Sequence, residues 1–172
     1  MKQKFVNLYM DWARRCAELS HARRLHVGAV IVKDDTVISY GYNGMPAGWD
    51  NDCEEKEWMD QGAGGWLDPE EIYERWPYVE YNEEAEEEYR YRLKTKPEVL
   101  HAESNAIAKL AKSSNSGKDA DIFITHSPCL DCAKLIYQSG IRRVYFGEHY
   151  RDNAGIDFLK KSNIEVEQVD AS

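Results

Sequence analysis

Two short motifs contain residues that can perform chemistry together. The first is His101-Ala102-Glu103 and the second is Pro128-Cys129-Leu130-Asp131-Cys132, and each begins a predicted helix. Cys129 and Cys132 are three residues apart, so one helical turn brings both sulfurs to the same side. The positive end of a helix favours their thiolate forms. One imidazole and two thiolates are suitable ligands for a tetrahedral zinc ion.

The composition of this ligand set indicates a catalytic zinc site. Two thiolates balance the charge of Zn²⁺, and three protein ligands leave the fourth position open, as catalytic sites do. Glu103 lies in the same turn as His101, where it cannot easily ligate the metal but can reach a water at the open position. A carboxylate there can take a proton from water and deliver it to a leaving group. The combination H-x-E with P-C-x-x-C is the signature of zinc-dependent nucleobase deaminases.

Two other interpretations of the cysteine pair stay open. The pair could hold a structural zinc with Cys53 as the fourth ligand, or it could be a redox pair. Glu103 argues against the first interpretation, and Pro128 with the paired histidine motif argues against the second. A second zinc lacks a clear ligand set, because Cys16 and His21 could join Cys53 only from the first helix.

The rest of the chain predicts a layered α/β fold in a single domain of residues 1–172. Residues 4–20 form an amphipathic helix in this prediction, with apolar side chains at helical spacing: Phe5, Leu8, Tyr9, Trp12, Cys16 and Leu19. Two β-branched runs around the turn Asp34-Asp35 predict a hairpin of residues 26–33 and 36–40, followed by a loop. Further helices are expected at residues 102–112, 129–139 and 154–161, and further strands at 121–125, 144–147 and 164–168. This order of elements gives a mixed five-stranded sheet covered by helices.

The segment of residues 50–98 carries the negative charge of the chain. It contains 17 acidic and 6 basic residues, whereas the rest of the chain has a net charge of +2. Its many aromatic residues argue against disorder, and we predict a helical acidic insertion. Asp68 caps one helix that begins at Pro69 and ends at Trp76-Pro77, and residues 83–88 form a solvated helical face. Three glycines interrupt the segment, namely Gly62, Gly64 and Gly65.

The composition also excludes some classes of protein. A net charge of -9 argues against binding to polymeric nucleic acid, which needs a basic excess. No apolar run approaches the roughly 20 residues that span a bilayer, and Asp11, Arg14 and Arg15 interrupt any signal-peptide core. We therefore expect no membrane partner and a cytoplasmic location, in the host cytoplasm if a phage encodes the chain. The near-neutral remainder suits a small anionic ligand.

Four stretches resemble the cytidine deaminase superfamily, and within it the deoxycytidylate deaminases of animals and tailed phages. They are V-G-A-V-I-V at residues 27–32, G-Y-N-G-M-P at 41–46, H-A-E-S-N-A-I at 101–107 and S-P-C-L-D-C-A-K at 127–134. The likeness covers most of the chain except the acidic insertion. It implies a three-layer cytidine-deaminase-like fold.

The resemblance also implies a reaction. His101, Cys129 and Cys132 would bind one catalytic zinc ion. Glu103 would take a proton from the zinc-bound water, protonate N3 of cytosine and later protonate the departing amine. The substrate would be dCMP, the products would be dUMP and ammonia, and the dUMP would serve dTTP synthesis.

The same resemblance assigns contacts to the nucleoside. Asn43 would bind the sugar and Tyr150 would stack on the base. Ser127 and Pro128 would line the amino-group side of the pocket with their backbone, and Ala102 belongs to the same substrate-binding set.

Phosphate recognition needs cations, because a nucleoside monophosphate carries nearly two negative charges. The resemblance places Arg24 and Arg151 at the phosphate, with Arg23 as the obvious competitor for Arg24. His126 is interpreted as a core residue or as a support of the site.

Regulation is a further implication of the resemblance. Gly41, Tyr42, Asn43 and Gly44 would form an allosteric site for a deoxynucleoside triphosphate with Mg²⁺, where dCTP activates and dTTP inhibits. Glycines let backbone amides approach a ligand closely, although a plain turn is the alternative interpretation of Gly41 and Gly44. The chain would assemble as a homo-hexamer.

Two alternative functions remain at this point. One is a deaminase of another small cytosine nucleotide or nucleoside. The other, of a different class, is a zinc-stabilised interaction module whose contact surface is the acidic segment.

Overall fold

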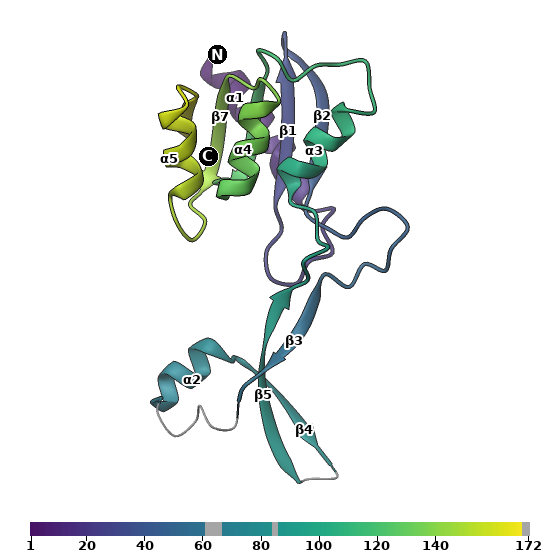
Figure 1. Cartoon of the computed structure of the whole chain (residues 1–172), viewed down its shortest axis with the longest axis vertical. Coiled ribbons are helices and arrows are strands. Elements are labelled where there is room, and N and C mark those ends of the chain that lie inside the picture. The colour runs from purple at the N-terminus through teal and green to yellow at the C-terminus, as the bar shows by residue number, and fades with distance from the viewer. Residues whose placement is uncertain (61–66, 84–85, 170–172) are drawn as a thin grey trace.

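The chain folds into a layered body from which a long arm projects (Figure 1). The computed structural model describes residues 1–60, 67–83 and 86–169. The helices of the body are α1 (Gln3–Ala17), α3 (Ala102–Leu110), α4 (Leu130–Gln138) and α5 (Ala154–Lys161). Its strands are β1 (Gly28–Lys33), β2 (Thr36–Tyr42), β6 (Asp121–His126), β7 (Arg143–Glu148) and β8 (Glu165–Gln168).

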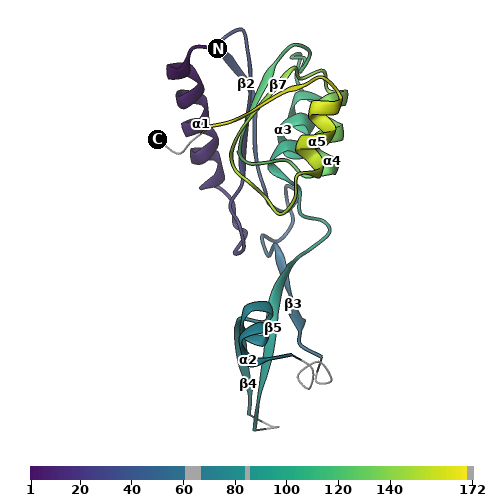
Figure 2. The same cartoon turned by 90° about the vertical axis from the view of Figure 1, so that its left-hand side faces the viewer.

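The five strands form one mixed sheet in the order β2-β1-β6-β7-β8. Strand β1 is antiparallel to both β2 and β6, whereas β6, β7 and β8 are parallel. Helix α1 covers one face of the sheet, and α3, α4 and α5 cover the other (Figure 2). The three-layer α/β fold expected from the sequence is therefore confirmed.

Neighbouring side chains of the central strands point to opposite faces of the sheet, and a hydrophobic core forms on each face. Val30 and Phe123 pack with α1, whereas the adjacent Ile31 and Ile122 pack in the core under α3 and α4. Successive side chains of a strand point to opposite faces, so an uninterrupted apolar strand fills both layers. This explains why β1 is apolar up to its last residue, Lys33, and why the middle of β6, at residues 122–124, is apolar as well.

Helix α1 forms as predicted, but its buried stripe differs from the expected one. The buried residues of the helix are Val6, Tyr9, Met10, Ala13 and Ala17. Leu8, Trp12 and Leu19 are exposed instead, with roughly half of their surface accessible. The sheet accepts the side of the helix that carries Ala13 and Ala17, because Gly28 lets the α1 backbone approach closely there. A Cβ on Gly28 would lie 2.0 Å from the carbonyl oxygen of Ala13.

The predicted hairpin is present, but its second strand is longer than expected. Asp34 and Asp35 both have positive φ angles, 49° and 57°, as a two-residue type I′ turn requires. Strand β2 continues to Tyr42, since Gly41 pairs with Ala29 and Tyr42 with Gly28. The prediction that Gly41 and Tyr42 lie in a loop was therefore wrong.

The prediction of a helical insertion was also wrong. The arm is mainly a three-stranded antiparallel sheet in the order β3-β5-β4. Its strands are β3 (Glu54–Trp58), β4 (Tyr78–Asn82) and β5 (Glu87–Thr95). Glu87 and Glu88 begin β5 rather than continuing a helix. Gly62, Gly64 and Gly65 lie outside the described residues.

One predicted helix of the arm is confirmed. Helix α2 (Pro69–Arg75) has Asp68 as its N-cap, which accepts a hydrogen bond from the Glu71 amide at 2.9 Å. Trp76 is the C-cap, just before Pro77. Within the described part of the chain, no helix is long and apolar enough to cross a membrane.

Candidate active site

The two motifs meet where the helices α3 and α4 begin. His101 is the N-cap of α3, Cys129 is the N-cap of α4, and Cys132 lies in the first turn of α4. Neither His101 nor Cys129 makes a side-chain capping hydrogen bond within the described residues. Both side chains are therefore available to a ligand, at helix ends that favour thiolates.

The distances among these three side chains suit a tetrahedral metal. Nδ1 of His101 lies 3.6 Å from Sγ of Cys129 and 3.4 Å from Sγ of Cys132. Ordinary zinc–nitrogen and zinc–sulfur bonds at a tetrahedral angle would separate the two ligand atoms by about 3.6 Å. The donor set and its spacing therefore fit zinc.

The cluster has three members in the described part of the chain. His101, Cys129 and Cys132 form the group whose ligand atoms all lie within 4.8 Å of one another. Cys53 lies elsewhere, buried beside Ala22 and Val99. The alternative of a closed structural site with Cys53 as fourth ligand is therefore not supported.

Hydrogen bonding among the ligands already favours one thiolate. Contacts from Cys132 and His101 lower the pKa of Cys129 to about 4, and the bond to Cys129 raises the pKa of His101. The bond between Cys132 and Cys129, together with burial, raises the pKa of Cys132. A divalent cation would stabilise both thiolates, since a coordinated thiol loses its proton.

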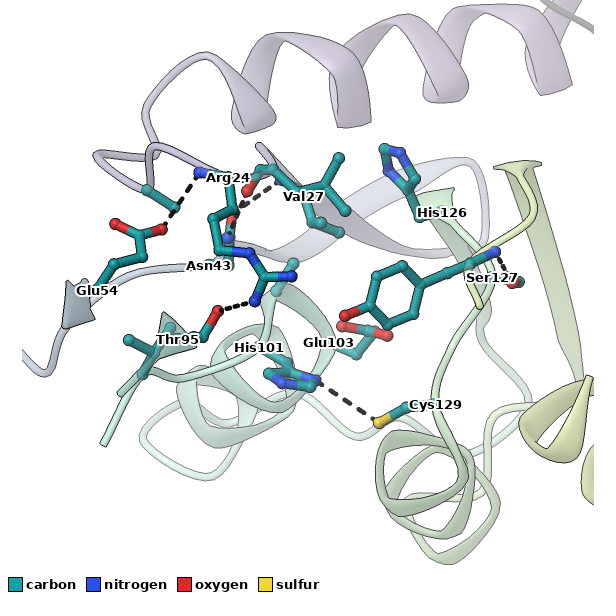
Figure 3. Close-up of a pocket in the computed structure, with 15 residues that line it drawn as sticks. Arg24, Val27, Asn43, Glu54, Thr95, His101, Glu103, His126, Ser127 and Cys129 are labelled. Carbon is teal, nitrogen blue, oxygen red and sulfur yellow. Dashed lines mark hydrogen bonds between the residues drawn. The ribbon is translucent and has the colours of Figure 1, made fainter. Parts of the chain in front are cut away.

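Glu103 is a buried carboxylate beside the cluster. Its side chain points into the pocket next to His101 (Figure 3), and the residue is 4% exposed. Burial raises the pKa of Glu103 to about 7, because a charge is poorly solvated there. A carboxyl group with such a pKa can both accept and donate a proton near neutral pH.

A cavity of about 240 Å³ brings most of the predicted residues together. Eight of them line it: Arg24, Asn43, His101, Ala102, Glu103, Ser127, Cys129 and Tyr150. An adjoining hollow of about 600 Å³ shares Arg24, Cys129 and Tyr150 with the cavity and adds Arg151. The structure does not place Pro128, Gly41, Tyr42 or Gly44 in the walls of either space.

Tyr150 and Arg151 form one unit at the junction of the two spaces. The Tyr150 amide donates a hydrogen bond to Oγ of Ser127 at 2.8 Å. The Arg151 guanidinium lies 5.0 Å from the centre of the Tyr150 ring, and Arg151 has a positive φ of 46°. This places an aromatic face and a cation side by side.

Asn43 holds the backbone that leads into strand β1, beside the cavity. Its Oδ1 accepts from the Val27 amide and its Nδ2 donates to the Leu25 carbonyl, both at 2.8 Å (Figure 3). The amide oxygen and nitrogen each keep a further hydrogen-bonding position. The predicted contact of Asn43 with a sugar is compatible with this geometry and stays a prediction.

Sequence reasoning missed Glu54 and Thr95, which line the same cavity from the arm. Oγ1 of Thr95 accepts from Nη1 of Arg24 at 3.2 Å (Figure 3). Arg23 instead lies 3.3 Å from Asp52 and 3.6 Å from Glu54. The structure therefore favours Arg24 over Arg23 as the arginine of the pocket.

His126 also contributes to the wall. It lines the cavity, and its Nε2 lies 3.4 Å from Glu148. Burial lowers the pKa of His126, which favours the neutral ring. From the sequence we predicted that His126 is a core residue or a support of the site. In the structure it also lines the cavity.

Gly41 has a packing role that the sequence did not reveal. A Cβ on Gly41 would lie 2.1 Å from the carbonyl oxygen of Ala102 and 2.6 Å from the amide nitrogen of Ala106. Glycine at this position lets helix α3 pack directly on β2. The interpretation that Gly41 opens its backbone to a ligand is not supported.

The fold and the site together define a class of protein. A three-layer α/β body that presents one histidine, two cysteines and an adjacent buried carboxylate has the design of the zinc-dependent base deaminases. A family model described as the cytidine and deoxycytidylate deaminase zinc-binding region matches residues 2–148. The chain belongs to this family.

Individual relatives agree with this assignment. The chain is 36% identical over 161 residues to a deoxycytidylate deaminase of Enterobacteria phage T4, covering 83% of this chain and 78% of the relative. It is 31% identical over 155 residues to the deoxycytidylate deaminase of Homo sapiens, covering 84% and 70%. The crystal structure of the dCMP deaminase from cyanophage S-TIM5 in complex with dCMP and dUMP superimposes with a TM-score of 0.74 at 35% identity. That match covers 98% of this chain and 99% of the cyanophage chain.

Proposed function

We propose that this protein catalyses the hydrolytic deamination of dCMP to dUMP and ammonia. The observation that carries the proposal is the buried Glu103 beside His101, Cys129 and Cys132, at a cavity that continues into a hollow with two arginines. The cyanophage relative, solved with dCMP and dUMP, supports the choice of nucleotide.

Zinc bound by His101, Cys129 and Cys132 would supply a hydroxide-like nucleophile at neutral pH. Glu103 would accept one proton of the attacking water and give it to N3, and it would then take the remaining proton of the hydroxyl at C4 and give it to the leaving amine. A bond from oxygen to C4 forms and the bond from C4 to the amino nitrogen breaks. The buried position of Glu103 keeps it poised for both directions of transfer.

The remaining residues would hold the nucleotide in place. Tyr150 stacks on the base, and Asn43 binds the sugar. Ala102, Ser127 and Pro128 belong to the amino-group side. Arg24 and Arg151 bind the phosphate, because both line the hollow next to the catalytic cavity.

Two measurements on the purified protein test this function. Metal analysis should find one zinc per chain, and the ultraviolet absorbance of cytosine should fall with dCMP as substrate. We expect the highest kcat/KM for dCMP among dCMP, dCTP, CMP and deoxycytidine. A preference for deoxycytidine or CMP would support the alternative cytosine substrates. Zinc without turnover of any of the four would support the interaction module.

Regulation and assembly belong to the same proposal. We infer that dCTP with Mg²⁺ activates the enzyme and that dTTP inhibits it, in a homo-hexamer. The dUMP produced would serve dTTP synthesis in the cytoplasm. The support for these points is the likeness of residues 41–46 to deoxycytidylate deaminases.

A further inference from the structure

Glu54 and Thr95 are paired in the first rung of the arm, opposite each other in strands β3 and β5. We call these two residues the arm root. Both line the catalytic cavity, and both contact Arg24. We propose that the arm root positions Arg24 for the phosphate of the substrate, an inference that rests on the proposed function.

Glu54 fixes the backbone from which Arg24 extends. Its side chain is 1% exposed, and a buried carboxylate is costly unless donors surround it. Oε1 accepts from the amide of Arg24 at 3.3 Å (Figure 3). It also accepts from the amide of Arg23 at 3.0 Å. Oε2 lies 3.6 Å from Nε of Arg23. The turn at residues 23–24 is therefore held by a buried carboxyl group of the arm.

Thr95 holds the other end of Arg24. Its hydroxyl accepts one N–H of the guanidinium, and the guanidinium has five N–H donors in total. A neutral hydroxyl orients the group without cancelling its charge. Among the described residues, the nearby carboxylates Asp52 and Glu54 pair with Arg23 instead. Arg24 therefore keeps its positive charge for an anion.

The position of Arg24 matches this role. It lines both the catalytic cavity and the adjoining hollow, where Arg151 also lies. A phosphate attached to a nucleoside in the cavity would reach this junction. The arm therefore contributes to substrate selection through its root, although most of it lies far from the body (Figure 1).

Binding of the product tests the inference apart from turnover. Titration calorimetry on the zinc-loaded protein would compare dUMP with deoxyuridine, which lacks the phosphate. We expect Thr95→Val to weaken dUMP binding by about 3- to 10-fold, the range for losing one ordinary hydrogen bond, because Thr95 acts on the phosphate only through Arg24. Deoxyuridine binding should stay unchanged. Thr95→Ser should restore dUMP binding, because it keeps the hydroxyl. Glu54→Gln should act like Thr95→Val.

Controls separate this role from a structural one. Thr36→Val and Glu57→Gln make the same chemical changes at the exposed end of β2 and further along the arm, and neither should alter the preference for dUMP. In an Arg24→Ala background, Thr95→Val should cause no further loss, since Thr95 acts through Arg24. Equal weakening of both ligands, or an unchanged preference in both arm-root variants, would overturn the inference alone. A wild-type protein without any preference for dUMP would overturn the proposed function as well.

Discussion

Glu103 has an environment that suits proton transfer. It is buried next to His101, Cys129 and Cys132, and its raised pKa reflects that burial. We predict that Glu103→Gln keeps about one zinc per chain and lowers kcat for dCMP by roughly 10²- to 10⁴-fold, the usual contribution of a general acid–base. Metal analysis and the absorbance assay on the same sample measure both quantities. Normal turnover in a zinc-replete variant would contradict the assigned role.

Arg151 stands at the other end of the substrate site. Its guanidinium lies over Tyr150 and lines the hollow beside the cavity. We predict that Arg151→Ala lowers kcat/KM for dCMP about 10- to 150-fold, as expected for loss of a charge-assisted phosphate contact. Deoxycytidine carries no phosphate, so its kcat/KM should change little. Equal losses on both substrates would mean that Arg151 supports the loop instead.

At the scale of elements, the contact between β2 and α3 places His101 and Glu103. Gly41 makes this contact possible, because any Cβ there would clash with the α3 backbone. We predict that Gly41→Ala destabilises the protein by about 3 kcal/mol, as overpacking does, and lowers Tm by roughly 6–12 °C. Differential scanning calorimetry measures the shift.

Gly44 is the matched control for Gly41. A Cβ on Gly44 would meet only ring atoms of Tyr42, at 3.9 Å. Gly44→Ala should therefore leave Tm almost unchanged. A similar Tm for the two variants would show that close packing on α3 is not what position 41 requires.

The helices and strands of the body could be predicted from the sequence, because each of them has a strong local sequence pattern. Strand β1 and the middle of β6 are apolar runs, and both candidate catalytic motifs begin helices. The arm was misread because its charge was taken as a sign of solvated helices. Strand β5 in fact alternates, with Tyr89, Tyr91 and Leu93 separated by Arg90 and Arg92. That period of two indicates a strand.

The arm root could not be found in the same way. Glu54 and Thr95 contact Arg24 from 30 and 71 residues away in the sequence. Neither residue belongs to a motif, and a single glutamate in an acidic segment reads as a surface charge. Their role emerges only when the β3–β5 pairing places them beside the cavity. The candidate metal ligands differ, because the short spacing within each motif already suggests their chemistry.

At the scale of the whole molecule, the negative charge is concentrated in the part that projects from the body. The body is near neutral, whereas the projecting arm carries the acidic excess (Figure 1). The arm leaves the body beside the first turn of α3, so the acidic segment begins at the active site and extends away from it. Such a distribution keeps most of the negative charge distant from the arginines that would bind phosphate.

Residues 42–44 belong to the proposed regulatory segment, and they are hydrogen-bonded to the beginning of helix α3 and the residue before it. Gly44 and Leu100 exchange two backbone hydrogen bonds, of 3.1 and 2.9 Å. Nδ2 of Asn105 donates to the Tyr42 carbonyl at 3.0 Å. Leu100 directly precedes His101, and Asn105 lies one turn into α3. A ligand that shifts this segment would therefore shift His101 and Glu103 with it.

From the likeness of residues 41–46 to deoxycytidylate deaminases, we predict that dCTP raises, and dTTP lowers, the rate at subsaturating dCMP when Mg²⁺ is present. Effectors with opposite signs must favour different states of the enzyme, and a coupling of typical size would change the apparent affinity for dCMP by about 5- to 150-fold. Rate curves against dCMP with each triphosphate, beside curves with the metal chelated, measure the effect, and light scattering gives the assembly. Unchanged hyperbolic curves together with a monomeric mass would contradict regulation through residues 42–44, while the Glu103 prediction would stand unaffected.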